Sequence, residues 1–280
     1  MSPPVFLRSL LYNLYYAGIT ILLTPATLLA SLHPNYDYRY RMSRLWCWLL
    51  VKGAEKICGI GYRIEGSERI PQTNGIVLSK HQSAWETFLL YLLFPKAVYV
   101  LKRELAYIPF FGWCAVRYRH IFVDRKRPRE SAKRFLREGG ERLRQGHWII
   151  LFPEGQRVLP GERVPYAKSG GLLAAKAGVP VVPVALNSGR FWPRRGFFKY
   201  PGTVTVRIGE PLDGSRLSAE EINRRAEAWI EAQMAELEGE ADGHRPRKIP
   251  TERLDPPRRS RGRPTRWSRP SERHSDQQTG

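Results

Sequence analysis

The ten residues 79-SKHQSAWETF-88 bring a histidine, a serine and a glutamate together directly after an apolar run. Three kinds of chemistry use such residues: a serine nucleophile beside a base, a pair of metal ligands, or a histidine base oriented by a carboxylate. The preceding run GIVLSK predicts a strand, so His81 is expected at the carboxyl edge of a sheet, where α/β folds usually hold their sites. Glu86 then falls in the first turn of the next helix, where the helix dipole favours a carboxylate.

The spacing of His81 and Glu86 favours the third kind of chemistry. A turn can fold Glu86 back onto one imidazole nitrogen, which leaves the other nitrogen to take a proton as a general base. A nucleophilic Ser83, as in a serine hydrolase or thioesterase, lacks a G-x-S-x-G elbow, and a metal site lacks H-E-x-x-H or a carboxylate cluster. From these residues alone, a solvated loop histidine beside a surface glutamate stays open as an alternative.

Four further segments follow this stretch in a fixed order. They are 102-KRELAYIPFFG-112, 122-FVDR-125, 152-FPEGQR-157 and 179-VPVVPVAL-186. Together with the His-x4-Glu pair, they resemble in order and spacing the motifs of the glycerolipid acyltransferase superfamily, and in particular of the 1-acyl-sn-glycerol-3-phosphate acyltransferases. Any one of these motifs is weak evidence, whereas the ordered set, which extends over about residues 61–211, is highly specific.

The resemblance implies transfer of a fatty acyl group from acyl-CoA or acyl carrier protein to the sn-2 hydroxyl of 1-acyl-sn-glycerol-3-phosphate. The product would be phosphatidic acid, for phospholipid biosynthesis. His81 would remove the hydroxyl proton, and Glu86 would orient His81 and stabilise its imidazolium. Backbone N–H groups near the third motif or the His81 helix would stabilise the oxyanion. No covalent enzyme intermediate, metal or redox cofactor is implied, because the acyl thioester is a co-substrate.

The resemblance also implies which residues bind the glycerol-phosphate head group. They are Lys102, Arg125, Glu154, Gly155 and Arg157. Arg157 offers a planar fork for phosphate, Lys102 adds a point charge, and Gly155 permits close approach of the backbone. Exposed surface charges are the alternative interpretation of the arginines, and for Glu154 it is a partner that locks a nearby arginine in place.

Two positions depart from the family's pattern. Glu86 stands where the family usually has aspartate, and Gln156 stands where it usually has threonine or serine. The extra methylene of Glu86 requires either that His81 lies slightly differently or that the helix begins further back. Gln156 alters contacts to the head group, so an acyltransferase of the same mechanism acting on another lyso-lipid remains an alternative.

Residues 61–240 alternate strand-like runs with helix-like segments. The strand-like runs are GYRIEG, GIVLSK, AVYVLK, HIFVDR, HWIILF, PVVPVAL and TVTVRIG. The helix-like segments are residues 85–93, 128–143, 169–177 and 218–237. The alternation predicts an α/β acyltransferase domain with a mostly parallel sheet flanked by helices.

Residues 1–60 are predicted to form a membrane-associating helical pair. The apolar segment 7–32 is about long enough to cross a bilayer, and residues 41–58 surround an apolar stripe with tryptophans and basic residues, as is typical of a membrane interface. The basic residues after the first segment predict the cytoplasmic face of the inner (plasma) membrane. A signal peptide and a buried soluble helix are the alternatives.

The formal charge of +20 predicts anionic partners. Residues 241–280 carry eleven Lys/Arg against five Asp/Glu and no apolar periodicity, so we expect a basic disordered tail on a domain that is itself basic. A nucleic-acid-binding protein would explain the tail but not the His–Glu pair or the apolar N-terminus. The expected partners are therefore lysophospholipid and acyl thioester substrates, an anionic membrane surface and acyl carrier protein, with no specific nucleic acid. The three scattered cysteines favour a reducing compartment.

Overall fold

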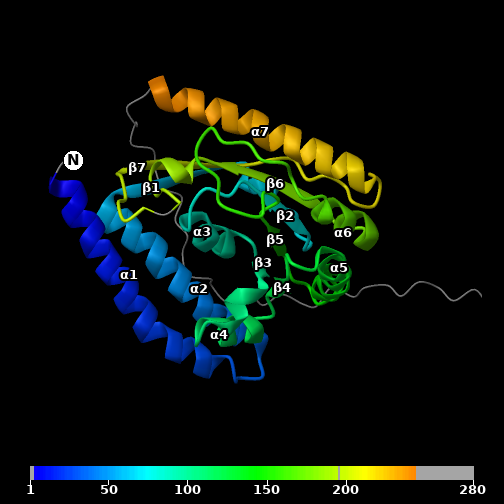
Figure 1. The fold of residues 1–280 in the computed structure, drawn as a ribbon, viewed down its shortest axis with the longest axis horizontal. Coiled ribbons are helices and arrows are strands. Elements are labelled where there is room, and N and C mark those ends of the chain that lie inside the picture. The colour runs from blue at the N-terminus through cyan, green and yellow to red at the C-terminus, as the bar shows by residue number, and fades with distance from the viewer. Residues whose placement is uncertain (1–2, 195, 244–280) are drawn as a thin grey trace, which may run out of the picture.

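The computed structural model describes residues 3–194 and 196–243 of the 280-residue chain, and its centre is a seven-stranded sheet (Figure 1). The strands are β1 (Ile60–Glu65), β2 (Ile76–Ser79), β3 (Val98–Lys102), β4 (Ile121–Val123), β5 (Ile149–Leu151), β6 (Val181–Leu186) and β7 (Gly202–Ile208). Their order is β1-β7-β6-β2-β5-β3-β4, and only the β6–β7 pair is antiparallel among these neighbours. Each predicted strand-like run overlaps one of these strands, and β1 and β7 begin one residue before their runs, so the mostly parallel α/β sheet is confirmed.

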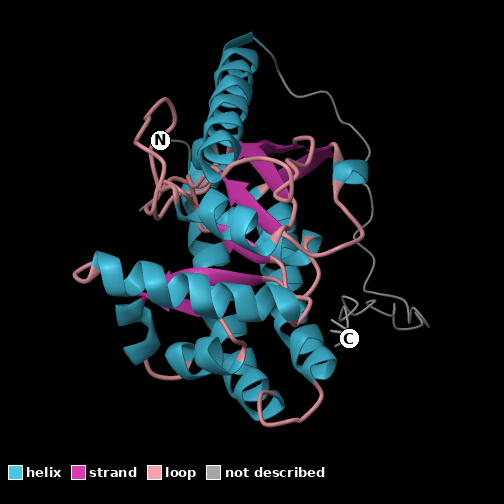
Figure 2. Cartoon of the chain, turned by 90° about the vertical axis from the view of Figure 1, so that its right-hand side faces the viewer, coloured by secondary structure: helices cyan, strands magenta, loops and turns pink. Residues whose placement is uncertain are grey.

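Helices cover both faces of the sheet (Figure 2). On one face lie α1 (Pro3–Ala30), α2 (Tyr36–Gly53) with its π-helical end (Ala54–Cys58), and α3 (Trp85–Leu93); on the other lie α5 (Pro128–Arg144), α6 (Ser169–Ala177) and α7 (Ala219–Gly243). Successive side chains of β2 point to opposite faces and pack into both cores: Val77 packs on the first side, and Ile76 and Leu78 pack on the second. Short 3₁₀ turns span Ser67–Arg69, Arg103–Tyr107 and Ser188–Arg190.

One helix was not predicted. Helix α4 (Phe111–Arg117) lies beside the C-terminal end of α1 in Figure 1, where the Tyr118 hydroxyl donates to the Thr27 carbonyl at 3.2 Å. The four helix-like segments predicted between residues 85 and 237 all form helices.

The N-terminal helices share a core with the sheet. Tyr12 of α1 and Leu50 of α2 are fully buried in the same hydrophobic cluster as Val204 of β7. The Tyr12 hydroxyl also donates to the Leu50 carbonyl at 2.9 Å, and the Lys199 N–H donates to Ser9 Oγ at 2.9 Å. The predicted boundary at residue 60 therefore does not divide two separate cores. At the other boundary α7 runs to Gly243, so the first three residues of the expected disordered tail (241–280) are helical, and the rest of that tail lies outside the described residues.

The outer side of α1 is apolar and exposed. Within residues 3–194 and 196–243, this is the one helix long and apolar enough to cross a membrane, and only 11% of its most apolar stretch is buried. Its exposed side chains include Leu14, Ile21, Leu22 and Leu29, each at least 63% exposed. An apolar surface of this extent on a water-soluble protein would be unusual, so it indicates association with a membrane.

The buried His147 and the partly buried His120 are expected to make the folded state sensitive to acid. His120 Nδ1 accepts a hydrogen bond from the Tyr99 N–H at 3.0 Å, and His147 Nδ1–H donates to the Lys96 carbonyl at 2.9 Å. Burial lowers the pKa of each imidazole from 6.5 to about 4. Between these two pKa values the unfolded chain binds protons that the folded chain does not. The contribution of the two neutral histidines to the free energy of unfolding is therefore fully present above about pH 6.5 and is lost as the pH falls toward 4.

We expect each histidine to remove on the order of 1–2 kcal/mol of stability between pH 7.5 and pH 5, while the raised pKa of Glu154 opposes this loss over the same interval. In His120→Asn the amide oxygen can still accept from the Tyr99 N–H, but the side chain no longer titrates, so the melting temperature should fall by roughly 5 °C less over this interval than in wild type. Differential scanning fluorimetry in detergent measures both. If the melting temperature of His120→Asn depends on pH as strongly as that of wild type, His120 does not contribute to the acid sensitivity.

Candidate active site

The parallel strands bring the predicted site residues to one edge of the sheet. The central strands β6, β2, β5, β3 and β4 are neighbours and point the same way, so their carboxyl ends lie side by side. His81 follows β2, Glu154 and Gly155 follow β5, Lys102 ends β3, and Arg125 follows β4. Segments up to about seventy residues apart in the sequence thus meet at one place.

His81 and Glu86 form the expected pair. His81 Nδ1 lies 2.9 Å from Glu86 Oε1. The same oxygen accepts the backbone N–H groups of Gln82 at 2.8 Å and Ser83 at 2.7 Å, while Oε2 accepts the Ser188 hydroxyl at 2.7 Å. The Glu86 side chain is fully buried, and all four partners are donors, as a carboxylate requires. A carboxylate accepts only, so Nδ1 carries the proton and Nε2 has a free lone pair.

Ser188 shows how the longer glutamate is accommodated. Helix α3 begins at Trp85, so Glu86 is its second residue, and its carboxylate reaches from the turn amides of residues 82 and 83 across to Ser188. Ser188 follows β6, the strand next to β2. The sequence offers no local signal for this contact, because the serine lies 102 residues beyond the glutamate.

Phe152 holds the plane of the His81 ring. The two rings stack with their centroids 3.8 Å apart and an angle of 15° between their planes. Phe152 directly follows β5, the other neighbour of β2, and sequence reasoning assigned it no role beyond its place in the third motif. Stacking and the Glu86 hydrogen bond together leave the His81 side chain only 13% exposed, at the edge of a cavity that it helps to line.

Glu154 does not lie where it was predicted. Its side chain is fully buried rather than facing the cavity, and Oε1 pairs with Lys80 Nζ at 2.7 Å, with no arginine in ion-pair distance in the described part of the chain. Oε2 accepts the backbone N–H of His81 at 2.7 Å. Burial raises the pKa of Glu154 to about 7, against the opposing effect of Lys80. The geometry therefore places this carboxylate behind the turn that carries His81 rather than in the cavity wall.

The predicted basic residues, in contrast to Glu154, line the cavity. Lys102, Arg125 and Arg157 do so, and Arg194, which sequence reasoning missed, joins them from the loop between β6 and β7. None of these four has a carboxylate within ion-pair distance in the described part of the chain. Four uncompensated cations at one cavity make a site for an anion, since each would gain a charge-assisted bond to a phosphate oxygen.

The turn at Gly155 is shaped to hold one of these cations. Gly155 has φ of +67°, a left-handed conformation that favours glycine, and its carbonyl accepts a hydrogen bond from the Arg125 guanidinium. A Cβ at this position would lie 3.4 Å from Arg125 Nη2. Gln156, the second departure from the family pattern, also lines the cavity.

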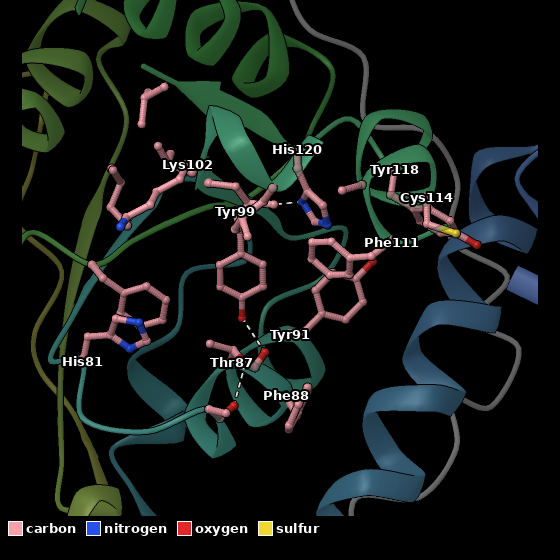
Figure 3. Close-up of a pocket in the computed structure, with 18 of the residues that line it drawn as sticks. His81, Thr87, Phe88, Tyr91, Tyr99, Lys102, Phe111, Cys114, Tyr118 and His120 are labelled. Atoms are coloured by element: carbon pink, nitrogen blue, oxygen red, sulfur yellow. Dashed lines mark hydrogen bonds between the residues drawn. The ribbon is translucent and has the colours of Figure 1, made fainter. Parts of the chain in front are cut away.

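The cavity itself has a volume of about 1360 Å³. Figure 3 shows His81 and Lys102 on one side of it and Phe111, Cys114 and Tyr118 on the other, toward the N-terminal helices. Its remaining wall comes largely from apolar and aromatic side chains of α1, α2, α3 and α4, among them Ile21 and Phe88. The cavity thus joins a basic end, with His81 at its margin, to an extended apolar interior.

Comparisons with known proteins agree with this geometry. A family model described as Acyltransferase matches residues 61–187. A 1-acyl-sn-glycerol-3-phosphate acyltransferase of Pseudomonas aeruginosa is 40% identical over 243 residues, covering 85% of this chain and 94% of that protein. One from Saccharomyces cerevisiae is 29% identical over 228 residues, covering 79% and 74% of the two chains.

A solved structure extends the likeness to the whole fold. The crystal structure of the 1-acyl-sn-glycerophosphate (LPA) acyltransferase PlsC from Thermotoga maritima superposes with a TM-score of 0.70 at 27% identity, covering 86% of this chain and 99% of that one. On this combination of sequence identity, coverage and structure, the chain belongs to the 1-acyl-sn-glycerol-3-phosphate acyltransferase family.

Proposed function

We propose that this protein transfers a fatty acyl group from an acyl thioester to the sn-2 hydroxyl of 1-acyl-sn-glycerol-3-phosphate and so forms phosphatidic acid. The observation that carries the proposal is that the His81–Glu86 pair lies at a cavity with two unlike ends. The basic end suits a phosphate monoester, and the apolar interior suits acyl chains. Its 1360 Å³ exceeds the roughly 300–1,000 Å³ of ordinary small-molecule pockets, as two lipid-like substrates require.

His81 acts as the general base. Its Nδ1–H is donated to Glu86, so Nε2 takes the proton from the sn-2 hydroxyl while that oxygen attacks the thioester carbonyl. The buried charge of Glu86 stabilises the resulting imidazolium. When the tetrahedral intermediate collapses, the carbon–sulfur bond breaks and the imidazolium returns the proton to the departing thiolate. No covalent bond to the protein forms.

The oxyanion needs donors other than the amides of the His81 turn. The N–H groups of His81, Gln82 and Ser83 already donate to Glu154 and Glu86. The Gly155 N–H is also occupied, by the Phe152 carbonyl at 2.9 Å. The amides of Gln156 and Arg157, two cavity-lining residues, donate to no acceptor in the described part of the chain. We assign the oxyanion to these two amides.

An assay with purified protein tests the function. Lysophosphatidate and lyso-lipids without a phosphate monoester are each offered with acyl-CoA and with acyl carrier protein loaded with the same acyl chain. We expect turnover with lysophosphatidate and a marked loss when the phosphate is capped by an alcohol head group, because the four cations then meet one charge fewer. Equal turnover of all lyso-lipids would favour the alternative acceptor, and release of free fatty acid without an acceptor would favour a thioesterase.

Arg157→Ala is expected to raise KM for lysophosphatidate roughly tenfold to a hundredfold, which corresponds to the loss of one bond between charged groups. The kcat value and KM for the acyl donor should change much less, because the His81–Glu86 pair is untouched. Arg134→Ala, which removes an exposed arginine paired with Glu138 on α5, serves as the control. Initial rates at varied lysophosphatidate give both constants. An unchanged KM would remove Arg157 from the head-group site.

We infer that the protein acts on the cytoplasmic face of the inner membrane. Side chains of α1 form hydrogen bonds with the α/β domain; for example, Asn13 Nδ2 donates to the Phe197 carbonyl at 3.1 Å. Helix α1 therefore lies along the domain, and its opposite side is free to contact lipid. The exposed Arg41 of α2 then faces anionic head groups, where a basic residue is worth about 1 kcal/mol. In sealed spheroplasts a C-terminal tag should resist added protease until lysis. Cleavage before lysis would contradict this orientation.

A further inference from the structure

A lysine with two carboxylate partners is buried directly behind the catalytic histidine. Lys80 is 2% exposed, and its Nζ lies 2.7 Å from Glu154 Oε1 and 2.8 Å from Glu231 Oε1. Burial lowers the pKa of Lys80, but the two carboxylates raise it by more, so the pKa lies above its usual value. A buried charge of this kind is tolerated only when it is paired, and removal of one partner disturbs the others.

The pair formed by Lys80 and Glu154 leads directly to His81. Glu154 uses its second oxygen to accept the His81 N–H at 2.7 Å. The His81 carbonyl in turn accepts the Val158 N–H at 2.8 Å. The segment after β5 thus holds the histidine backbone at both its N–H and its carbonyl, and Lys80 sets where the Glu154 carboxylate lies.

Glu231 is the outer end of this chain of contacts. It lies on α7, beyond residues 61–187, and no residue of α7 lines the cavity. Its Oε1 also accepts the Tyr166 hydroxyl at 2.7 Å, and its Oε2 accepts Arg163 Nε at 2.8 Å. One carboxylate on the C-terminal helix therefore joins the end of β2 to the loop that follows the third motif.

We propose that Glu231 is a positioning residue for His81, acting through Lys80 and Glu154. The inference rests on the proposed function of His81. Glu231 touches neither the cavity nor the His81–Glu86 pair, so it affects the reaction by fixing the position of the His81 backbone. A shift of the base relative to the substrate hydroxyl lowers the rate of proton transfer, whereas the four cations that hold the phosphate keep their places.

Glu231→Gln tests this with little change of shape. The glutamine oxygen can still accept from Lys80 and Tyr166, but its NH₂ group faces Arg163 and the negative charge is gone. We expect kcat to fall about tenfold with KM for lysophosphatidate and acyl donor unchanged within about twofold. Glu236→Gln is the matched control, since Glu236 lies on the same helix and pairs with Arg207 at 2.8 Å, away from Lys80. The control should keep the wild-type kcat.

Hydrogen–deuterium exchange gives a readout that does not depend on turnover. In Glu231→Gln the amides of peptides spanning residues 80–84 should exchange roughly tenfold faster, while the core strand β7 keeps its protection. A wild-type kcat with unchanged exchange at residues 80–84 would overturn the proposal. So would a loss of kcat that merely follows faster exchange throughout the sheet, because that is global destabilisation. If the wild-type protein acylates no lyso-lipid, the proposed function fails, and the exchange experiment still tests the link from Glu231 to His81.

Discussion

Replacement of His81 by alanine is expected to lower kcat for acyl transfer to lysophosphatidate by roughly a thousandfold or more, the usual contribution of a positioned general base. Nε2 of His81 is free at the margin of the cavity, because the bond to Glu86 is made by Nδ1 and Glu86 is itself fully buried. Without it, the sn-2 hydroxyl must lose its proton to water as it attacks the thioester.

The same variant should remain folded. The backbone bonds that hold residue 81, from its N–H to Glu154 and from the Val158 N–H to its carbonyl, do not involve the imidazole. Glu86 keeps three of its four donors. Thermal melts of His81→Ala and wild type should therefore agree within a few degrees, and His33→Ala, which changes an exposed histidine, should be as active as wild type. Near-normal turnover of purified His81→Ala would refute the mechanism.

Glu86→Gln is expected to lower kcat by roughly 10²–10⁴-fold with the fold retained. A glutamine oxygen can accept the three N–H groups that Oε1 receives, and its NH₂ group can donate to Ser188 Oγ once that hydroxyl rotates, so the Ser188 O–H is the one donor of this set that loses its acceptor. The charge is lost, however, and with it the stabilisation of the His81 imidazolium. If the amide turns the other way, it forces the proton onto Nε2 and removes the base.

Glu86→Asp separates charge from position. Aspartate restores the negative charge and is the usual residue of the family, but it is one methylene too short to reach the turn amides and Ser188 together as Glu86 does. We expect kcat between those of wild type and Glu86→Gln, in assays run beside thermal melts. Equal losses in the two variants would show that the place of the carboxylate matters and that its charge does not.

Local sequence predicted the scaffold well because strand and helix patterns are encoded over a few neighbouring residues. Helix α3 and helix α6 begin and end at the predicted residues, and each strand lies within one residue of a predicted run. The His81–Glu86 contact was predictable for the same reason, since five residues and one turn separate the two side chains. The motifs placed Lys102, Arg125 and Arg157 at ends of parallel strands, and the cavity has all three in its wall.

What the sequence by itself determined is therefore the strands and the helices other than α4, the membrane-seeking N-terminus and the local pair to which we assign the chemistry. Only the tertiary structure decided what surrounds that pair. Ser188 and Phe152 reach it because β6 and β5 are the two neighbours of β2, and Glu154 faces inward because Lys80, which also pairs with Glu231, meets it there. Strand order and helix docking result from packing many apolar side chains on both faces of one sheet. This packing depends on the whole chain, and no short sequence pattern contains it.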